Sequence, residues 1–327
     1  QLSLLLLAFR PELALLPLLL FALVSAVASF RPPSRYYLPV LSRGSRTEKA
    51  VSLTFDDGPD PLVTPRVLEL LARRGLRATF FLVGRKAESY PELVRAILEA
   101  GHTLGNHSYS HFPFLMLKGR KAIRREVEAA QAVFRSFGVA PLAFRPPAGV
   151  TAPPLWPVLL RLGMFCVNFD CRAGDVGNRR IRNLAHRILK RVRPGSIVLL
   201  HDTAPAKESL DRLLGEFETL VEGLEARGLE IRPLASLLGR EIMQSSGTTP
   251  EGHAAALFYD GLAATYDHEQ FFTAVSMSRR AELALFEAAL PRLFRKADHV
   301  LEIGAGTGIF TTRLAPHCGE VEALDIS

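Results

Sequence analysis

Apolar and polar residues follow two periodic patterns between residues 48 and 240, one typical of strands and one typical of helices. Short apolar runs that end at glycine, proline or an acidic residue are typical of buried strands, and between them apolar residues recur with helical spacing. The predicted strands are Val51–Phe55, Ala78–Val83, His102–Gly105, Ala143–Pro146, Phe165–Asp170, Ser196–His201 and Leu229–Ile231. The predicted helices between them include Thr64–Arg74, Pro91–Ala100, Lys121–Phe137 and Ile181–Val192.

Strands that alternate with helices in this way are typical of parallel α/β folds. We therefore predict a deformed TIM-like (β/α) barrel of about seven parallel strands over residues 48–240. Gly75, Gly101 and Gly138 directly follow predicted helices and are expected to end them. Because the chemistry of such barrels lies on the loops after the strands, polar residues at strand ends are the first site candidates.

The N-terminal residues follow neither of these periodic patterns. Leu2 to Phe9 are apolar, and Leu13 to Phe30 contain no charged residue. An uncharged run of that length is about the minimum for a helix that crosses a hydrocarbon core of roughly 30 Å. We expect residues 1–30 to form one or more hydrophobic membrane segments and residues 31–47 to form a basic linker. A cleaved signal peptide is the alternative, because Ala26-Val27-Ala28 resembles a small-residue cleavage site.

Charge around the hydrophobic segment predicts its orientation. Only Arg10 is basic before it, whereas the residues after it include Arg31, Arg35, Arg43, Arg46 and Lys49. Because basic flanks favour the cytoplasmic side, we expect a membrane-anchored protein with its catalytic domain in the cytoplasm.

Composition excludes some classes of protein. The net charge of +7 comes from basic residues spread over helices with little aromatic interleaving, so we expect no nucleic-acid partner. The cysteines are Cys166, Cys171 and Cys318. The first two lie on one predicted strand and point to opposite faces, so they cannot pair, and no disulfide framework is predicted.

Candidate chemistry begins where the first predicted strand ends, at Asp56 and Asp57. Adjacent carboxylates in a shared cleft raise each other's pKa, and a bound cation would relieve that repulsion. If Asp57 is a metal ligand, Asp56 lies beside the metal and can accept a proton. An Asp-Gly turn with solvated acids is the alternative interpretation.

Further polar residues follow later strands. His107 and His111 are four residues apart, which in a helical turn places both imidazoles on one face, as metal ligands require. With Asp57 they would form a two-histidine, one-carboxylate site, although capping or packing histidines are the alternative. Arg145 follows the fourth strand and could pair with Asp56. His201 ends the sixth strand at the same rim, and the convergence of all these residues favours a functional site.

These residues stand in motifs that resemble the polysaccharide deacetylase family, the NodB-homology domains or family 4 carbohydrate esterases. The motifs are Thr-Phe-Asp-Asp-Gly-Pro, His-Ser-x-x-His, Arg-Pro-Pro-x-Gly, a strand-end aspartate (Asp170) and Leu-x-His-Asp, in family order over about residues 48–240. The resemblance implies that Asp57, His107 and His111 bind a divalent metal, with zinc expected. It further implies a general base at Asp56, an orienting role for Arg145, a general acid at His201, and substrate contacts from Pro147, Ala148 and Leu199.

Two departures from the family pattern concern substrate shape. The family usually has an aromatic residue where Ala148 stands, and Asp-Trp where this chain has Asp175-Val176. Asp175 is nevertheless a carboxylate that could raise the pKa of His201 and so keep the acid protonated.

The expected activity is removal of N-acetyl groups from an amino-sugar glycan or a lipid-linked sugar. The cytoplasmic orientation favours a sugar on a lipid carrier at the inner membrane face. The alternatives are O-deacetylation or deformylation of a lipid-linked sugar, and a catalytically silent carbohydrate-binding module.

A second domain is predicted after a linker at residues 241–252. In residues 253–327, a predicted strand runs into Glu302-Ile303-Gly304-Ala305-Gly306-Thr307-Gly308, and Asp325 ends the next strand. Glycines after a strand let a cofactor approach the backbone, and an acid at the next strand end can bind ribose hydroxyls. The segment resembles the start of a class I S-adenosylmethionine-dependent methyltransferase, so Glu302, Gly304, Gly306, Gly308 and Asp325 are expected cofactor contacts in an incomplete Rossmann-like domain. An NAD site is the alternative.

Overall fold

A computed structural model of the chain describes residues 15–246, 299–303 and 315–324. The chain divides into two units, Gln1–Thr249 and Pro250–Ser327, which are described separately. The boundary between them falls inside the predicted linker at residues 241–252.

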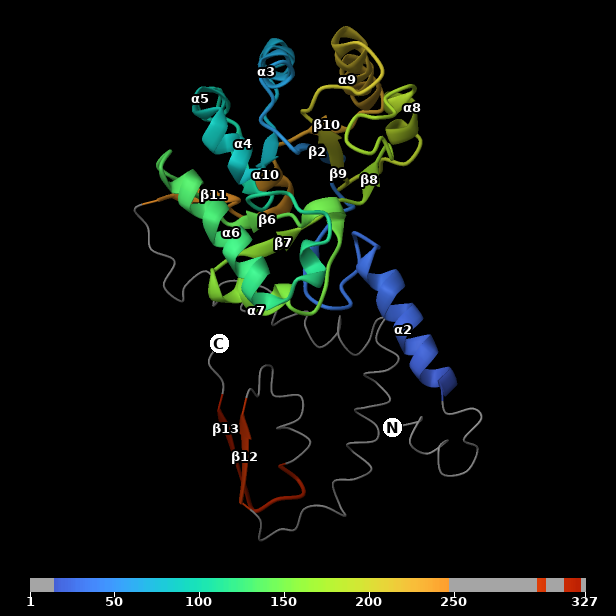
Figure 1. Cartoon of the computed structure of the whole chain (residues 1–327). Helices are drawn as coiled ribbons and strands as arrows, with labels where there is room; N and C mark the ends of the chain where they lie inside the picture. The colour runs from blue at the N-terminus through green and yellow to red at the C-terminus, as the bar shows by residue number, and fades with distance from the viewer. Residues whose placement is uncertain (1–14, 247–298, 304–314, 325–327) are drawn as a thin grey trace. The chain divides into compact units, whose positions relative to one another are not determined.

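The first unit is built on a curled sheet of parallel strands (Figure 1). The strand order is β1-β7-β6-β4-β3-β2-β9-β8, and β10 also pairs with β2. Within the described residues β8 and β1 are not paired, so the barrel is open between them. The strands are β1 (Val40–Leu41), β2 (Ala50–Asp56), β3 (Thr79–Leu82), β4 (Thr103–Asn106), β6 (Ala143–Phe144), β7 (Phe165–Val167), β8 (Cys171–Arg172), β9 (Ile197–His201) and β10 (Glu230–Ile231).

Helices cover the outer face of this sheet (Figure 1). Aromatic side chains fill the layer between them: Phe55 stacks on Phe80 at 5.1 Å and meets Phe217 of α9 edge-on at 5.7 Å. Full burial of each such side chain contributes about 1.5–3 kcal/mol. The helices are α3 (Thr64–Arg73), α4 (Gly84–Ser89), α5 (Pro91–Glu99), α6 (Arg120–Arg135), α7 (Leu155–Arg161), α8 (Leu184–Leu189), α9 (Leu210–Glu225) and α10 (Leu234–Leu238), with 3-10 turns η2 (Leu115–Leu117) and η3 (Pro147–Gly149).

Register brings the functional strand ends to one rim. Asp56 at the end of β2 is opposite His201 at the end of β9 and opposite Phe81 on β3. Asn106 at the end of β4 is opposite Phe144 at the end of β6. Since all these pairs are parallel, the loops that follow the strands emerge on the same side.

All seven predicted strands are present, with small differences at their ends. Gly75, Gly101 and Gly138 have φ of +62°, +77° and +79°, the left-handed conformation expected after a helix. The helix predicted at Ile181–Val192 is shorter, because Asn183 is left-handed with φ of +56° and α8 begins only after it.

Both predicted linkers contain strands, which corrects the expected boundaries. Residues 31–47 include β1, whose Val40 is buried and pairs with β7. The range 241–252 includes β11 (Met243–Ser245), which pairs antiparallel with β5 (Val139–Pro141). Cys166 and Cys171 lie on two strands, β7 and β8, not on one as predicted, and both thiols are free.

Helix α2 (Leu15–Ser29) occupies part of the predicted membrane segment and is highly apolar. In the part of the chain that the structure describes, no helix is both long and apolar enough to cross a bilayer.

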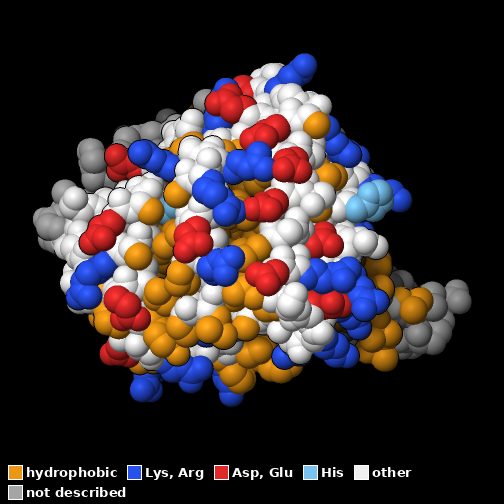
Figure 2. Space-filling view, turned by 90° about the horizontal axis from the view of Figure 1, so that it is seen from above, with side chains coloured by type: hydrophobic (Ala, Val, Ile, Leu, Met, Phe, Trp, Pro, Cys, Tyr) orange, Lys and Arg blue, Asp and Glu red, His pale blue; other side chains and the backbone are white. Residues whose placement is uncertain are grey.

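Surface charge is mixed on the face shown in Figure 2, where basic and acidic side chains are interspersed. Ion pairs join the outer helices, for example Arg73 to Glu218 at 2.6 Å and Arg74 to Glu222 at 2.7 Å between α3 and α9.

The described part of the second unit contains two parallel strands, β12 (His299–Ile303) and β13 (Glu320–Leu324). Glu302 lies in β12. The predicted cofactor residues Gly304, Gly306, Gly308 and Asp325 lie outside the described residues.

Candidate active site

A buried ion pair lies at the centre of the rim. Nη1 of Arg145 donates to Oδ1 of Asp56 at 2.6 Å and to the hydroxyl of Thr54 at 2.8 Å. The Arg145 side chain is fully buried, and Asp56 is only 3% exposed. The contact expected between Arg145 and Asp56 is therefore present, and it leaves Oδ2 of Asp56 for another partner.

Other contacts fix the guanidinium of Arg145. Its Nε and Nη2 donate to the carbonyl oxygens of Val167 and Asn168, at 3.3 Å and 3.2 Å. Its Cζ lies 3.9 Å from the centre of the Phe81 ring. A planar guanidinium held by hydrogen bonds and ring stacking has little freedom to rotate, so the orientation of Asp56 is also fixed.

Three potential metal ligands converge beside this pair. Nε2 of His111 lies 3.0 Å and Nε2 of His107 lies 3.4 Å from Oδ1 of Asp57. The candidate ligand atoms of the three residues all lie within 4.8 Å of one another.

The two histidines do not lie on a helical turn, which corrects the predicted geometry. Residues 107–111 form a loop, in which Ser108 and His111 have φ of +64° and +54°. Ser108 shapes this loop: its N–H donates to Oδ1 of Asn106, and its hydroxyl accepts from the N–H of His111. Both imidazoles nevertheless face the carboxylate of Asp57, and their ring centres are 4.8 Å apart.

A backbone contact assigns the tautomer of His107. Its Nδ1 lies 2.7 Å from the carbonyl oxygen of Arg145. Because a carbonyl can only accept, Nδ1 carries a proton, and Nε2 is the nitrogen that faces Asp57. Metal-bound histidines commonly have this supporting contact on the second nitrogen.

Asp57 itself is strained and strongly stabilised as an anion. Its φ is +71°, a conformation that costs a non-glycine residue about 1–2 kcal/mol. Burial would raise the pKa of Asp57, but hydrogen bonds from His107 and His111 and their charges outweigh burial and hold it far below its usual value. Nζ of Lys86 on α4 donates to the carbonyl oxygen of Asp57 at 2.7 Å and holds this backbone.

The residues fit a divalent transition metal. Two neutral imidazole nitrogens and one carboxylate oxygen form a donor set typical of zinc and similar ions. The oriented Nε2 of His107 and the deprotonated state of Asp57 both suit coordination, and Asp57 is only partly exposed.

An imidazole–carboxylate pair forms the opposite side of the site. Nδ1 of His201 lies 2.7 Å from Oδ2 of Asp175, the partner expected from the sequence, and Nε2 of His201 lies 4.0 Å from Oδ2 of Asp57. Nε2 is thus the atom directed toward Asp57 of the candidate metal site. Asn178 supports the pair: its backbone N–H donates to Asp175, and its Nδ2 donates to the carbonyl oxygen of His201.

The pair has matched pKa shifts. Burial lowers the pKa of His201, but the hydrogen bond from its ring to Asp175 and the negative charges of Asp175, Asp57 and Asp56 outweigh burial and raise it to about 9. Burial raises the pKa of Asp175, but the bond with His201 and its charge outweigh that effect and lower it. His201 is therefore protonated at neutral pH.

Asp170, the strand-end aspartate matched to the family motif, is not near His201. Its carboxylate accepts from the Ser196 hydroxyl and the Ile197 N–H, and it lies 3.5 Å from Arg43. These contacts join β9 to the segment around β1, so the role of Asp170 is structural.

The predicted substrate contacts occupy different environments. Leu199 is buried on β9 and pairs with Thr54 of β2. Pro147 is buried, whereas the neighbouring Ala148 is exposed and left-handed, with φ of +57°. Ala148 therefore offers a small side chain where the family usually has a large one.

Sequence reasoning missed several supporting residues. Lys86, Thr54 and Asn178 contact site residues, but nothing in their local pattern distinguishes them from other polar residues. Asp202 could have been found from the sequence, because it directly follows His201. It is fully buried, accepts from the Thr64 hydroxyl at 2.7 Å, and burial raises its pKa to about 8.

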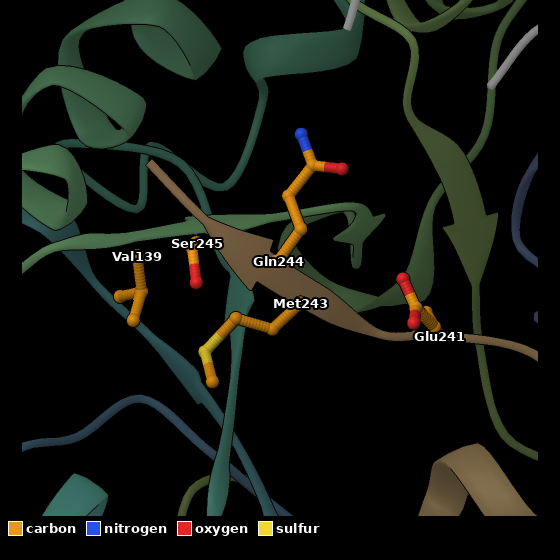
Figure 3. Close-up of a pocket in the computed structure, with 5 residues that line it drawn as sticks. All are labelled: Val139, Glu241, Met243, Gln244 and Ser245. Carbon is orange, nitrogen blue, oxygen red and sulfur yellow. The ribbon is translucent and has the colours of Figure 1, made fainter. Parts of the chain in front are cut away.

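A separate hollow of about 450 Å³ lies beside β5 and β11 (Figure 3). Because β5 precedes β6 in the chain and Arg145 follows β6, this hollow is at the other end of β6 from the rim. It is lined by Val139, Glu241, Met243, Gln244 and Ser245.

The chain is similar in sequence to a known family and to named proteins within it. The family model for polysaccharide deacetylases matches residues 43–167. The chitooligosaccharide deacetylase of Azorhizobium caulinodans is 34% identical over 203 residues, which cover 59% of this chain and 96% of that protein. The peptidoglycan-N-acetylglucosamine deacetylase of Bacillus cereus is 32% identical over 157 residues, which cover 47% of this chain and 73% of that protein.

Similar folds are found among solved structures. The crystal structure of the Bc1960 peptidoglycan N-acetylglucosamine deacetylase, in complex with a naphthalenyl N-hydroxybenzamide, superposes with a TM-score of 0.56. It is 28% identical and covers 62% of this chain and 94% of that chain. The family 4 carbohydrate esterase from Streptomyces lividans, in complex with acetate, gives a TM-score of 0.50 at 33% identity, over 56% of this chain and 91% of that chain.

Proposed function

We propose that this chain, which belongs to the polysaccharide deacetylase family, removes N-acetyl groups from an amino-sugar glycan in a metal-dependent reaction. It is a hydrolase of the deacetylase type that acts on carbon–nitrogen bonds. The similar proteins are named for chitooligosaccharide and for peptidoglycan N-acetylglucosamine. N-acetylglucosamine residues are therefore the proposed substrate.

Asp57, His107 and His111 would hold the metal ion, and zinc is the proposed occupant. When bound, such an ion polarises the acetyl carbonyl as a Lewis acid and makes a nearby water easier to deprotonate. His107 is oriented for this role by the Arg145 carbonyl oxygen. Asp57 is held by Lys86, so the ligand set is largely preformed.

Asp56 takes the proton from the attacking water. Its Oδ1 is occupied by Arg145, which leaves Oδ2 as the accepting atom. The guanidinium holds the carboxylate in one orientation, and a positioned base of this kind contributes about 10²–10⁴-fold to a rate.

His201 delivers a proton to the leaving nitrogen. Asp175 keeps the imidazolium protonated and oriented through Nδ1, so the Nε2 proton is directed into the site. Water adds to the acetyl carbonyl as Asp56 takes its proton, and the carbon–nitrogen bond breaks as the nitrogen takes the proton of His201. The products are a free amino sugar and acetic acid, and transfer of the proton from Asp56 to His201 restores the starting state.

The observation that carries this proposal is the simultaneous presence of an available base, a protonated acid and a three-atom ligand set at one rim. A carbohydrate-binding module without catalytic activity needs none of these groups at one site. The buried Asp56–Arg145 pair is costly to build, because desolvation of each ion costs several kcal/mol.

The proposal is tested by assaying the purified full chain, depleted of metal and reloaded with zinc, on chitooligosaccharides and on peptidoglycan fragments. Released acetate and free amine should appear in equal amounts. His107→Ala and His111→Ala should lower zinc affinity at least about a hundredfold, since each removes a ligand. His186→Ala, an exposed histidine on α8, is the control.

Zinc binding that is unchanged in both ligand variants would contradict the metal site. Release of formate, or of acetate from an ester without free amine, would instead favour the O-deacetylase or deformylase alternative. Lipid-linked amino sugars belong in the same assay, because a cytoplasmic, membrane-anchored location remains our prediction.

For the second unit we propose the start of an S-adenosylmethionine-dependent methyltransferase domain. The support is local: β12 and β13 are parallel and flank the glycine-rich segment at residues 304–308, as the predicted order requires. Binding of radiolabelled S-adenosylmethionine to the full-length protein, compared with a Gly304→Val/Gly306→Val variant, tests this. Equal binding by both forms, or binding of NAD instead, would contradict it.

A further inference from the structure

Exposed apolar side chains of the barrel gather on one rim. Among the described residues, the large apolar side chains that remain exposed belong either to the segment from Leu15 to Phe30 or to the loops after β2, β4 and β8. Within the described chain, the outer helices α3, α5, α6 and α9 contribute none. The exposed loop residues, here called the apolar rim, are Leu62, Phe112, Phe114, Leu117 and Val176.

The apolar rim surrounds the catalytic residues. Leu62 is on the loop that carries Asp57, Phe112 directly follows His111, and Val176 directly follows Asp175. Leu62, Leu117 and Val176 lie on three separate loops and are 65%, 79% and 60% exposed, so apolar side chains on several loops are left uncovered around this rim. Whatever covers the apolar rim therefore also lies against the mouth of the active site.

The apolar helix α2 is bonded to the same rim. The N–H of Thr151 donates to the carbonyl oxygen of Ser29, the last residue of α2, at 3.1 Å. Nδ2 of Asn168 donates to the carbonyl oxygens of Pro32 and Gly149, at 2.9 Å and 3.1 Å. These partners lie on the loops after β6 and β7, so the end of α2 is held at the rim.

The loop with Phe114 is tied to the chain that follows α2. Leu115 and Met116 of η2 are buried in one apolar cluster with Leu38 and Val40. Their neighbours Phe114 and Leu117 point away from this cluster into solvent. Because Leu115 and Met116 are buried, the segment that exposes Phe114 and Leu117 is held in place.

Exposed basic residues lie next to the apolar rim. Lys118, Arg120, Lys121, Arg124 and Arg125 follow Leu117 at the start of α6, and all are exposed. Arg179 and Arg180 follow Val176 and are exposed as well. Acidic residues are fewer here: Glu126 accepts from Ser110, Glu208 accepts from Arg182, and Glu128 lies 3.8 Å from Arg124. The net charge beside the apolar rim is therefore positive.

We propose that the apolar rim docks on the interface of an anionic phospholipid bilayer. Phe114 and Leu117 insert at the level of the headgroups, and the basic residues at the start of α6 lie against the phosphates. Apolar side chains combined with cations are what such an interface recognises. A neutral glycan has no partner for these cations, and aliphatic tips such as Leu117 give it no hydrogen bond.

The docked orientation turns the active site toward the headgroups. A soluble substrate would then reach the site from the side, whereas an amino sugar attached to a lipid would be presented at its mouth. The lipid-binding proposal itself does not depend on deacetylation, and it is tested without substrate.

Flotation of the full chain with vesicles of phosphatidylcholine, alone or mixed with phosphatidylglycerol, gives the test. Phe114→Ser/Leu117→Ser should weaken binding to both compositions about tenfold. Lys118→Glu/Lys121→Glu should weaken binding to anionic vesicles at least about tenfold and hardly change binding to neutral ones.

Lys190→Glu/Arg193→Glu is the matched control. It changes the net charge by the same amount, at exposed positions before β9, at the end of that strand remote from His201. Its binding to anionic vesicles should fall less than about threefold. Circular dichroism and turnover of a soluble chitooligosaccharide should be unchanged in all three variants.

A positive signal complements the loss of binding. Phe114→Trp places an indole on the apolar rim, and brominated lipids should quench it beyond the signal from Trp156 of the parent. Absence of extra quenching, or vesicle binding unaffected by both rim variants, would overturn the proposal. So would a Phe114→Ser/Leu117→Ser protein that binds vesicles normally but has a raised KM for soluble oligosaccharide, since the apolar rim would then be a glycan surface.

Discussion

The two sides of the active site are held in different ways. Asp56 is fixed from within the sheet by Arg145, whose guanidinium contacts β2, the end of β7 and the ring of Phe81. His201 depends on Asp175, which lies on a loop after the two-residue strand β8. On the base side several side-chain contacts set the position of Asp56, whereas on the acid side the contact with Asp175 sets the protonation of His201.

Stability and rate should therefore depend mainly on the base side, and pH dependence mainly on the acid side. Substitutions on the base side should lower stability and rate together, because position and charge are shared by the same buried network. Substitutions on the acid side should mainly change the pH dependence.

Arg145→Met should have the largest effect. Removal of one partner from a buried ion pair costs about 3–5 kcal/mol, because the other charge stays buried without compensation. We expect the free energy of unfolding, measured by urea denaturation, to fall by that amount and activity to be lost. Asp56→Leu in the same chain should restore much of the stability but none of the activity. A single variant as stable as the parent would show that the pair does not hold the base side.

Asp56→Asn should retain the fold and the metal but lose turnover. The amide keeps the shape and can still accept from Arg145, yet it cannot take a proton, so we expect kcat to fall about a thousandfold. Zinc content and kcat are measured on the same preparation. Asp211→Asn, an exposed residue of α9, is the control. A substantial residual rate would move the base to another group.

Asp175→Asn should shift the pH profile. The reaction needs protonated His201, so activity should fall as pH rises through the pKa of His201, which is raised to about 9. A bound cation opposes protonation, so the alkaline limb should lie at or below that value. Without the Asp175 charge the pKa falls, and the limb should move to lower pH by at least about one unit.

The same shift has a consequence for stability. Because the pKa of His201 is raised on folding, its pairing with Asp175 stabilises the fold fully below the unfolded-state pKa of about 6.5, and this stabilisation is lost as pH rises through about 9. Asp175→Asn should flatten that dependence. A limb and a stability profile that both stay in place would show that another group protonates the leaving nitrogen.

Asn178 should give the smallest effect. Its side chain donates to the carbonyl oxygens of His201 and Thr203, both at 2.8 Å, and its φ is +61°. Asn178→Ala loses these bonds and keeps the strain, so we expect a loss of about 1–2 kcal/mol in stability and a severalfold lower kcat. Asn178→Gly removes the strain and should be the more stable of the two, by about 1 kcal/mol. Equal stabilities would mean that backbone strain is unimportant here.

The sequence predicts the main strands well because each is a buried apolar run bounded by a strong turn signal. Positions at strand ends then bring Asp56, Asp57, Arg145 and His201 together with no further information. The short strands β1, β5, β8 and β11 were not predicted. With two or three residues each, they have no periodicity, and their pairing depends on distant partners.

Local geometry inside the site was less predictable. A spacing of four between His107 and His111 suits a helix, but Ser108 and Asn106 stabilise a loop that brings the rings together in another way. Lys86 reaches Asp57 from a helix whose sequence resembles any amphipathic surface helix. Such contacts depend on tertiary structure and have no signature in the residues around them.

The reach of Arg145 across the sheet has a consequence for how the protein matures. Asp56 and Arg145 are 89 residues apart in sequence, and the guanidinium also needs the backbone after β7. Closure of so long a loop is entropically costly, whereas β2, β3 and β4 pair through shorter connections. During synthesis, Asp56 therefore lies beside its neighbouring strands before its counter-ion, Arg145, is in place. We expect a nascent chain to acquire its oriented catalytic base only after β7 has docked, and its acid later still, because β9 follows β7 in the chain.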